Sequence, residues 1–575
     1  MDNSSETPTS SVHQFVAPKD TFYSPQNYTF YAQNPYETLD KSSRCIRLLK
    51  VCERDADNRP IGYKFTNWIP LDEARDTYTA ISYCAGDPKN TRSIQVNGLQ
   101  FNAFANLARA LVDTCAYRKE HHDDDDPLIW ADQICIDQSN PHERSHQVGL
   151  MGDIYRAARD VTVCLSSTDR PNAAFDLIND LRDKIEWPTL HTVASALGKL
   201  NRNYGQSIMK IRQLYMKLAS RLQSLDVLAI AKEPWWRRAW TFQEFQLAKN
   251  PHFVYGDRAI PWLHLATVMI SFESDVVWSD SRHGRDNIEA IRFHFSHKTS
   301  SRRGDLLQLL MHSYLCGTSD ERDRVYAFLG LVESYQVYPD YASKTVDDVY
   351  TDAARSIMIH DGNLNVLLFA AYSRGTVSAI LPSWVPDWTT PSKSDLGGRV
   401  WAYHADFRWG ISPVSGVIDF TDSGKVLQVT GRYLETLTSR LETVRTSGKD
   451  TLEYELSAAG RNISVCTNTY TRCKDEQWLL AGLRVPVILR AVVQSKKSAE
   501  DRTRHESQTP RLGDEKEIAQ ADDSPRDHSA QISCPRRYYF VSTAWIEYTT
   551  EEGLRNYMRH VGNNQGRRDE IIHIV

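Results

Sequence analysis

The residues best suited to chemistry lie between Leu128 and Tyr155, in the segment LIWADQICIDQSNPHERSHQVGLMGDIY. An apolar run carries polar side chains where it ends, and a helix-start signal follows at once. The polar side chains are two carboxylates and one primary amide, plus a further carboxylate in the first helical turn: Asp132, Asp137, Gln138 and Glu143. In open α/β sheets, ligands bind outside the carboxyl ends of the strands. This strand-to-helix junction is therefore a candidate ligand site.

The start of the helix is marked by three residues. Asn140 can cap the helix, Pro141 suits its first position, and Glu143 stands where a capping-box carboxylate belongs. Asp132 falls within the predicted strand, where an unpaired carboxylate would be costly. We expect it to meet Arg144, Arg238 or backbone donors.

Two further segments complete a three-part pattern. YTAISYCAGD (78–87) predicts a strand that stops at Gly86, with Asp87 beside the turn and able to face the same pocket. PWWRRAWTFQE (234–244) predicts the start of a helix rich in Trp and Arg. Its i, i+4 spacing places Trp240 and Glu244 on one helical face.

In this order the three segments resemble the fungal heterokaryon-incompatibility (HET) domain, whose usual wording is Y-x-A-L-S-Y-x-W-G, then L-W-I-D-x-x-C-I-N-Q, then W-x-x-R-x-W-T-x-Q-E. The chain has Ala85 where the family usually has Trp, and Asp137 where it usually has Asn. Either change could alter a pocket. The resemblance implies a cytoplasmic protein of fungal non-self recognition that triggers cell death. Its partner would be a protein of that recognition system, or a second copy of the chain.

The same residues are more distantly similar to Toll/interleukin-receptor (TIR) domains. The Y-D-A-F-I-S-Y opening is matched at Tyr78, Ala80, Ile81, Ser82 and Tyr83, and W-x-x-x-E at Trp240 and Glu244. Enzymatic TIR domains use that glutamate to cleave the nicotinamide–ribose bond of NAD. The resemblance implies NAD as a substrate, with no permanently bound cofactor.

Such a reaction assigns a role to each side chain. Loss of nicotinamide leaves an oxocarbenium-like ribose, which the Glu244 carboxylate would stabilise. Trp240 would stack on an aromatic ring, and Arg237 or Arg238 would hold a phosphate. The structural alternative is a helix whose tryptophans fill the core while Arg238 and Glu244 pair with neighbours.

Two other functions stay open, so the residues alone do not decide whether the chain is an enzyme. One is a non-enzymatic signalling module of the same fold that acts by self-association. The other is a cysteine-dependent hydrolase with Cys135 as nucleophile and His142 or His146 as base. Because Cys135 lies between Ile134 and Ile136, a buried and inert thiol is the simpler interpretation.

Composition narrows the class of protein. The 575 residues are 41% hydrophobic and 25% charged, as in ordinary globular proteins, and are too many for a single core. The net charge of −5 gives no reason to expect nucleic acid as a partner. We find no membrane-spanning run, signal peptide, zinc spacing or Gly-rich phosphate loop. HHDDDD (121–126) is interpreted as a solvated loop, so no metal site is predicted.

The predicted fold is α/β: a TIR-like parallel sheet flanked by helices with a helical insertion, then a helical region and a small β-containing C-terminal region. The boundaries are a disordered tail at 1–42, the HET domain at 43–262, a mainly helical region at 263–425 and the C-terminal region at 426–575. A disordered insert is expected at about 496–534.

Individual elements follow from local patterns. Asn97-Gly98 predicts a hairpin over 94–104. Apolar runs predict strands at 161–166, 252–257, 426–437 and 478–493, and helical periodicity predicts an insertion of helices at 172–186 and 206–230. In the downstream segment DERDRVYAFLGL, Asp323 is expected to cap a helix or pair with an arginine.

Overall fold

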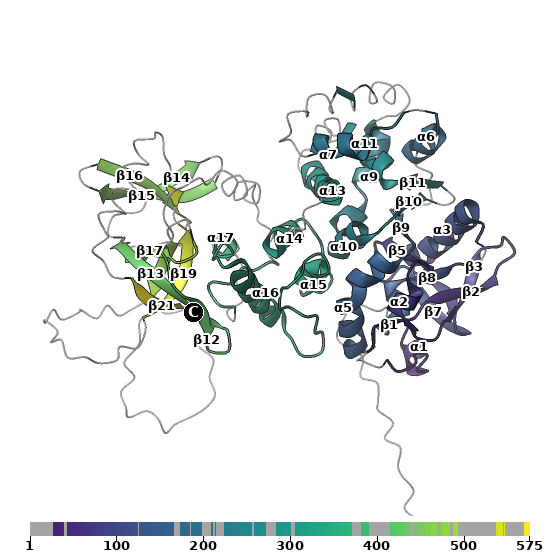
Figure 1. Cartoon of the computed structure of the whole chain (residues 1–575), viewed down its shortest axis with the longest axis horizontal. Helices are drawn as coiled ribbons and strands as arrows, with labels where there is room; N and C mark the ends of the chain where they lie inside the picture. Colours follow the sequence, from purple (N-terminus) through teal and green to yellow (C-terminus); the bar gives the residue numbers. More distant parts are fainter. Residues whose placement is uncertain are drawn as a thin grey trace, which may run out of the picture. The chain divides into compact units, whose positions relative to one another are not determined.

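The computed structural model (Figure 1) describes residues 27–39, 43–124, 126–165, 173–184, 186–197, 209–210, 213, 224–255, 258–271, 283–300, 305–370, 381–389, 414–437, 442–446, 449–458, 461–467, 472, 474–483, 487–492, 536–543, 545–546 and 569–575. The chain divides into two compact units. The first comprises Met1–His360 and Asp387–Trp401, and the second comprises Asp361–Pro386 and Ala402–Val575.

A large mixed sheet organises the first unit. Within the described residues it has nine strands in the order β11-β10-β9-β5-β8-β2-β3-β6-β7. Their bounds are β2 Leu49–Arg54, β3 Pro60–Phe65, β5 Tyr78–Tyr83, β6 Thr91–Val96, β7 Leu99–Phe104, β8 Leu128–Trp130, β9 Asp160–Cys164, β10 Pro251–Tyr255 and β11 Arg258–Pro261. A short pair, β1 (Cys45–Ile46) with β4 (Ile69–Pro70), lies apart from it.

The centre of this sheet is parallel, and its flanks are mixed. β8, β5, β9 and β10 are parallel neighbours, and so are β3 and β6, whereas β2 pairs antiparallel with both β8 and β3, and β6–β7 and β10–β11 are hairpins. The prediction of a parallel sheet was therefore wrong for the flanks. Parallel strands need crossover connections, and the short links between β2 and β3, β6 and β7, and β10 and β11 allow only antiparallel pairing.

The hairpin predicted at Asn97-Gly98 is confirmed. Both residues have positive φ, 52° and 76°, and the flanking residues Val96 and Leu99 pair directly. These are the backbone angles of a type I′ turn, whose twist matches that of the two strands.

Helices cover both faces of the parallel centre. Chain order places β8 on one side of β5 and β9 on the other, so right-handed crossovers put the helices after β5 and after β8 on opposite faces. Within the described residues, the helices of the first unit are α1 Tyr28–Ala32, α2 Leu71–Ala74, α3 Ala105–His122, α4 Asp132–Cys135, α5 Pro141–Ala157, α6 Ala173–Leu181, α7 Leu190–Leu197, α9 Ser224–Ala231, η2 Pro234–Arg237, α10 Ala239–Leu247, α11 Trp262–Ser271, α13 His283–Thr299, α14 Leu306–Ser313, α15 Asp323–Leu329 and α16 Val346–Asp361.

The predicted helical insertion is described in part. α6 and α9 fall within the two expected ranges, and α7 lies between them. Most of 206–223 lies outside the described residues. Among the residues that are described, no helix has the length and apolar character needed to cross a membrane.

Residues 27–39, expected in a disordered tail, instead pack against the edge strand β7. The Asn27 side chain accepts a hydrogen bond from the Asn102 N–H and donates one to its carbonyl, at 2.7 and 3.0 Å. Phe30 stacks edge-on against Phe101 and is buried. Large aromatic side chains here bury enough apolar surface to order the segment, which composition alone did not reveal.

At the start of α5 the predicted N-cap, Asn140, is confirmed, and the predicted capping box with Glu143 is wrong. The Asn140 side chain accepts from the His142 and Glu143 N–H groups, at 3.1 and 3.3 Å. The Glu143 carboxylate does not return to Asn140. It accepts from the Asp137 N–H at 2.8 Å instead, so Glu143 orders the preceding loop.

Helix α10 lies beside α13 and α15 (Figure 1), and residues that follow the sheet bind it at both ends and in its middle. Before its first turn, Gly317 bonds the backbone of Arg237 and Ala239 on either side of Arg238. In its middle, the Gln243 side chain accepts from the Gly330 N–H at 2.8 Å. At its C-terminus, the Lys298 ammonium donates to the carbonyls of Phe245, Gln246 and Ala248.

The core between α10, α13 and α14 contains two buried histidines, which makes stability sensitive to acid. His294 and His312 have ring centroids 5.8 Å apart, and both rings lie against Phe242. Burial lowers the pKa of His294 to about 4 and that of His312 well below its ordinary value. The unfolded chain therefore binds more protons below pH ~6.5, and stability is lost as the pH falls from there towards 4.

We expect His294 alone to lower the free energy of unfolding by on the order of 2 kcal/mol between pH 7 and pH 5. Urea unfolding at the two pH values measures it. His312→Phe should reduce the total loss of stability. Neither ring nitrogen of His312 has a hydrogen-bond partner among the residues that the structure describes, and phenylalanine keeps the stacking on Phe293. An unchanged pH dependence in this variant would contradict the assignment.

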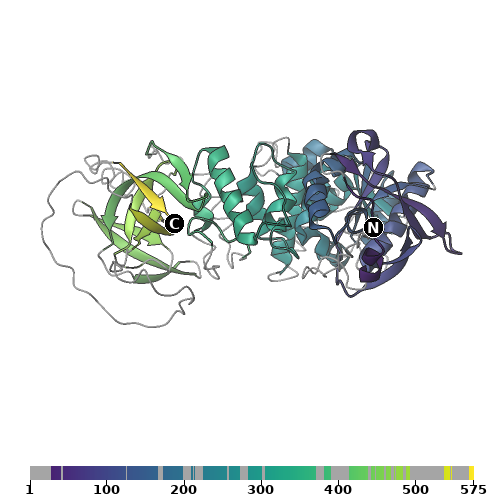
Figure 2. The ribbon, with the colours of Figure 1, turned by 90° about the horizontal axis from the view of Figure 1, so that it is seen from below.

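The second unit is built from strands, as predicted for the C-terminal region (Figure 2). Among its described residues, β13 pairs with β17 and with β21, and β17-β18-β19-β21 closes the ring. The bounds are β12 Ile418–Thr421, β13 Val426–Thr436, β14 Glu442–Thr446, β15 Lys449–Ala458, β16 Arg461–Thr467, β17 Glu476–Leu480, β18 Val487–Ala491, β19 Arg537–Thr543, β20 Trp545–Ile546 and β21 Glu570–Ile574, with the short helix α17 Leu367–Ala370. The predicted insert at 496–534 lies outside the described residues.

Candidate functional site

The three sequence segments meet at the guanidinium of Arg238. Its Nη1 donates to the carbonyl oxygen of Tyr83 at 2.6 Å, and its Nη2 lies 3.7 Å from Asp132 Oδ2. The Tyr83 hydroxyl in turn donates to Asp132 Oδ1 at 2.8 Å. Tyr83 ends β5, Asp132 follows β8, and Arg238 precedes α10, so the carboxyl ends of neighbouring parallel strands bring these side chains together.

Asp132 lies in a short helix and not, as predicted, inside a strand. β8 ends at Trp130, and α4 begins at Asp132. The Asp132 carboxylate accepts from the Gln133 N–H at 2.7 Å, so its side chain stabilises the turn that stops the strand. The side chains of Asp132 and Arg238 keep 20% and 18% of their exposure, so the pair is partly exposed.

Glu244 lies deeper, on the sheet side of α10. It is 2% exposed, and its Oε2 accepts from the Ser82 hydroxyl at 2.5 Å. Burial raises the pKa of Glu244 to about 8, and the nearby guanidinium of Arg238 opposes that rise. A carboxyl with so perturbed a pKa, beside a partly open ion pair, is characteristic of functional sites.

The tryptophans around Glu244 are packing residues. Trp235 and Trp236 are fully buried and in edge contact, with ring centroids 4.9 Å apart. Trp240, proposed above to stack on a ligand, is 7% exposed and hydrogen-bonds Asp323 of α15. Asp323 also accepts from the Tyr341 hydroxyl, at 2.5 Å. Asp323 thus binds two neutral donors, and the charge of Arg144 acts on its carboxyl as well.

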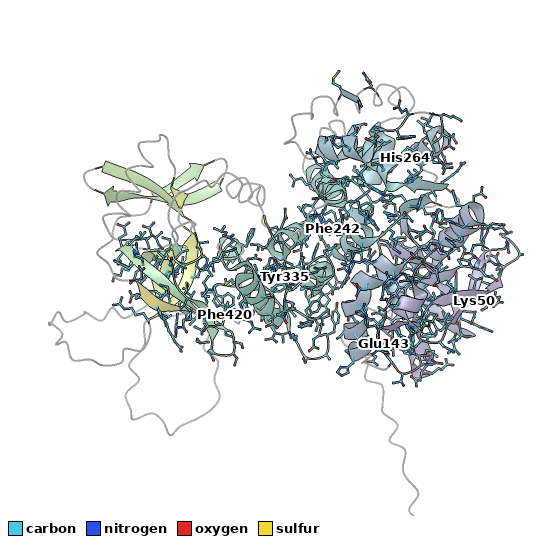
Figure 3. All side chains as sticks on the ribbon, in the orientation of Figure 1. Lys50, Glu143, Phe242, His264, Tyr335 and Phe420 are labelled. Carbon is cyan, nitrogen blue, oxygen red and sulfur yellow. The ribbon has the colours of Figure 1, made fainter. Side chains whose placement is uncertain are left out.

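Glu143 and Asp137 belong to a second, separate cluster around Arg47. Glu143, labelled at the start of α5 in Figure 3, forms a buried ion pair of 2.6 Å with Arg47. The Arg47 guanidinium lies 4.5 Å from the ring centroid of Tyr36 and 4.1 Å from that of Trp68. Burial raises the pKa values of Glu143 and Asp137. These two carboxyls order a loop and do not face Arg238.

The remaining predicted residues shape loops. Gln138 donates to the Asp132 carbonyl at 2.8 Å and so holds α4 in place. Gly86 has a φ of 78°, and a Cβ there would lie 2.9 Å from the Asn106 amide nitrogen. Asp87 is exposed and accepts from the Lys89 N–H at 2.9 Å, which closes its own turn.

Cys135 is a buried thiol. It is 1% exposed, and burial raises its pKa to about 12. The sulfur accepts from the Ala131 N–H at 3.4 Å and lies 3.9 Å from the Ile129 carbonyl. A thiol with this pKa supplies almost no thiolate at neutral pH, so nucleophilic attack by Cys135 has no support.

Sequence reasoning missed three residues at these sites. Ser82 and Tyr155 both contact Glu244, and Arg47 neutralises Glu143. Ser82 could have been found, since it is a polar residue inside the apolar strand 78–83. Arg47 could have been found in the same way, because it is a charged residue within the apolar run IRLL. In the part of the chain that the structure describes, no group of three or more His, Cys, Asp or Glu side chains could hold a metal ion.

Comparison with known proteins gives two matches. Residues 78–244 match the family described as "Heterokaryon incompatibility protein (HET)". Over 365 residues the chain is 25% identical to "Heterokaryon incompatibility protein 6, OR allele" of Neurospora crassa, which covers 54% of this chain and 53% of that protein. The chain thus spans about half the length of the curated relative it matches. No solved structure matches the chain.

Proposed function

We propose that this chain, a HET domain protein, acts in fungal heterokaryon incompatibility and triggers cell death when a non-self protein partner is sensed. The family match and the name of the Neurospora relative support the incompatibility role. We place the action in the cytoplasm, with a recognition protein or a second copy of the chain as partner. The proposal concerns the HET domain, because the relative covers only half of the chain.

One observation supports a functional site at Arg238: each of the three segments that resemble the family places a polar group close to its guanidinium. Asp132 lies 3.7 Å from it, Tyr83 accepts from it, and Glu244 interacts with its charge. Packing alone does not require three segments to converge on one partly exposed cation. In addition, Tyr83 and Asp132 follow adjacent parallel strands, where open α/β sheets bind ligands.

We propose NAD cleavage as the chemistry at this site. Arg238 would hold a phosphate of the dinucleotide, in competition with Asp132. Glu244, once ionised, would stabilise the positive charge that develops on the ribose as nicotinamide leaves, and a water molecule would then bond to the same ribose carbon and release a proton. NAD would be consumed as a substrate, and the reaction needs no resident cofactor.

A second candidate is a non-enzymatic module that signals through contact with another protein. The observation in its favour is that Glu244 is 2% exposed and Trp240 is packed against α15. In that case the buried cluster stabilises the fold, and only the exposed surface of the domain carries the signal.

Asp132→Asn in the full chain tests the site. The change keeps the shape of the side chain and removes the charge that pairs with Arg238. Because Asp132 competes with the phosphate for Arg238, we expect NAD consumption to rise. The rise, measured in cells that express the protein, should be roughly tenfold, the value of one charge-assisted contact. Asp57→Asn is the matched control, since the Asp57 side chain is 71% exposed.

Cell viability and NAD content should be followed together. If cells that express the unaltered chain die while their NAD content stays normal, NAD cleavage is wrong and the interaction module is favoured. If the Asp132 and Asp57 variants consume NAD as the unaltered chain does, the site has been placed on the wrong residues.

A further inference from the structure

The start of helix α3 lies at the carboxyl end of strand β5, beside the cluster around Arg238. The chain leaves β5 at Tyr83, forms the β6–β7 hairpin and enters α3 at Ala105. The Asn106 side chain donates to the Cys84 carbonyl at 2.8 Å, and Arg238 donates to the preceding carbonyl, that of Tyr83. Two consecutive carbonyls at the end of β5 are therefore bound, one by a residue of α3 and the other by the residue ahead of α10.

The first turn of α3 has free positive character. A helix of 18 residues carries a partial positive charge at its N-terminus, where the first N–H groups have no acceptor within the helix. Phe104, at the N-cap, provides no side-chain hydrogen bond, and the first turn contains no acidic residue. The Asn90 carbonyl accepts from the Ala105 N–H at 2.9 Å, so the preceding loop satisfies one of these groups. Ala105 and Asn106 are half-buried, so the start of the helix reaches the surface.

A buried amide adds a further donor at the same place. The Gln133 Oε1 accepts from the Phe104 N–H at 3.1 Å, which fixes the orientation of the amide, because only its oxygen can accept. Since the amide is bound to the N-cap residue, its NH₂ group lies beside the start of α3. Gln133 is 3% exposed, and its Nε2 has no hydrogen-bond partner among the residues that the structure describes. A buried donor without an acceptor is costly, and water or a bound ion is its usual partner.

The charges around this amide favour an anion as that partner. Asp132, which precedes Gln133, is offset by the guanidinium of Arg238 at 3.7 Å. Asp87, in the loop after β5, accepts from the Lys89 N–H and is exposed, so solvent screens its charge. Backbone N–H groups and an amide donor at the N-terminus of a helix are the elements of a phosphate site.

We infer that the start of α3 and the Gln133 amide form a binding site for a phosphate group, supplied either by inorganic phosphate or by a nucleotide. Its position at the carboxyl ends of the parallel strands is where open α/β sheets bind ligands. In the reaction proposed above, and resting on it, this site would hold one phosphate of NAD while Arg238 holds the other. The phosphate site itself does not depend on that reaction, because no group at the start of α3 takes part in bond cleavage.

Titration of the full chain with sodium phosphate at pH 7 and constant ionic strength, followed by calorimetry, tests the site. Gln133→Glu keeps the oxygen that accepts from Phe104 and replaces the amide donor by a carboxylate oxygen, which repels an anion. We expect this change to weaken phosphate binding at least roughly tenfold, the value of one charge-assisted contact. Gln100→Glu, at an exposed position on β7, adds the same charge and should bind phosphate as the unaltered chain does.

Ala105→Asp is a second variant, which keeps the test decisive if Gln133→Glu does not fold. It places a carboxylate at the half-buried first position of α3, where a negative charge stabilises the helix and replaces the anion. Without phosphate, its melting temperature should equal or exceed that of the unaltered chain, and its phosphate binding should be weaker by roughly tenfold or more. Unchanged phosphate binding in a folded Gln133→Glu protein or in Ala105→Asp would overturn the inference, as would absence of binding to the unaltered chain.

A parallel titration with AMP identifies the source of the phosphate. An affinity for AMP more than about tenfold above that for inorganic phosphate, and lost in the same variants, supports a nucleotide ligand. Equal affinities support free phosphate as the ligand of the same site. None of these measurements involves NAD, so failure of the proposed cleavage and failure of the phosphate site are separate results.

Discussion

Cells that express the full chain with Glu244→Gln are expected to survive, and their NAD content is expected to stay normal. The substitution keeps the size and hydrogen-bonding capacity of the side chain but removes any charge it can acquire. The charge that would stabilise an oxocarbenium-like ribose is then missing. We expect NAD turnover by the purified protein to fall roughly 10²- to 10³-fold, the usual effect of removing one group that stabilises the transition state.

Circular dichroism and urea unfolding show whether the Glu244→Gln protein is folded, and Glu120→Gln controls for expression. A folded Glu244→Gln protein that still consumes NAD would exclude Glu244 as the catalytic carboxylate. A folded protein that still kills cells whose NAD never falls would favour the interaction module. An unfolded protein would show that Glu244 is needed for the structure itself.

Arg47→Ala is expected to cause the largest loss of stability, about 3–5 kcal/mol in the free energy of unfolding. Arg47 and Glu143 have side chains that are each 3% exposed and lie 2.6 Å apart. Without the guanidinium, the Glu143 carboxylate is left buried and unpaired, and the aromatic rings of Tyr36 and Trp68 border a cavity. The midpoint of urea unfolding at pH 7 measures the loss.

The double variant Arg47→Met, Glu143→Gln should recover part of that loss, because it removes both charges and refills the space between the rings. Arg59→Ala, whose side chain is 64% exposed, should change the free energy of unfolding by less than about 0.5 kcal/mol. If Arg47→Ala is as stable as Arg59→Ala, the ion pair does not stabilise the fold.

Local patterns predicted the central elements of the fold well. β5, α5, β9 and β10 each carry an apolar repeat with a clear start or stop, such as Asn140 and Pro141 before α5. The Asn97-Gly98 hairpin was predictable because few residues accept positive φ at two successive positions. In the C-terminal region the apolar runs predicted β13, and one strand at 478–493 where the structure has two, β17 and β18.

The flanks of the sheet were not predictable in the same way. Whether β2 pairs parallel or antiparallel with β8 depends on a partner that lies almost eighty residues away, and the apolar pattern of β2 is compatible with either. The end of β8 was misplaced because Ile134 and Ile136 continue the apolar run. The chain turns earlier, at Asp132, whose carboxylate binds the next N–H group.

The candidate site, too, could be predicted only in part. Asp132, Arg238 and Glu244 could be named because family segments and the strand ends point to one place. Their distinct roles could not be named, since these depend on depth: Arg238 keeps 18% of its exposure and Glu244 is 2% exposed. The assignment of Glu143 to a different cluster depends on Arg47, which is almost one hundred residues distant in sequence.

The way α10 is held has a consequence for allele-exchange experiments. The stretch that matches the family ends at Glu244, yet Lys298, Gly317 and Gly330 bond that helix from outside the stretch. A chimera that exchanges only residues 78–244 between two relatives would join a helix from one parent to contacts from the other. Breakpoints beyond about residue 341 keep Asp323 and Tyr341 with the Trp240 they contact. The segment that can be inherited as a working whole is longer than the segment by which the family is recognised.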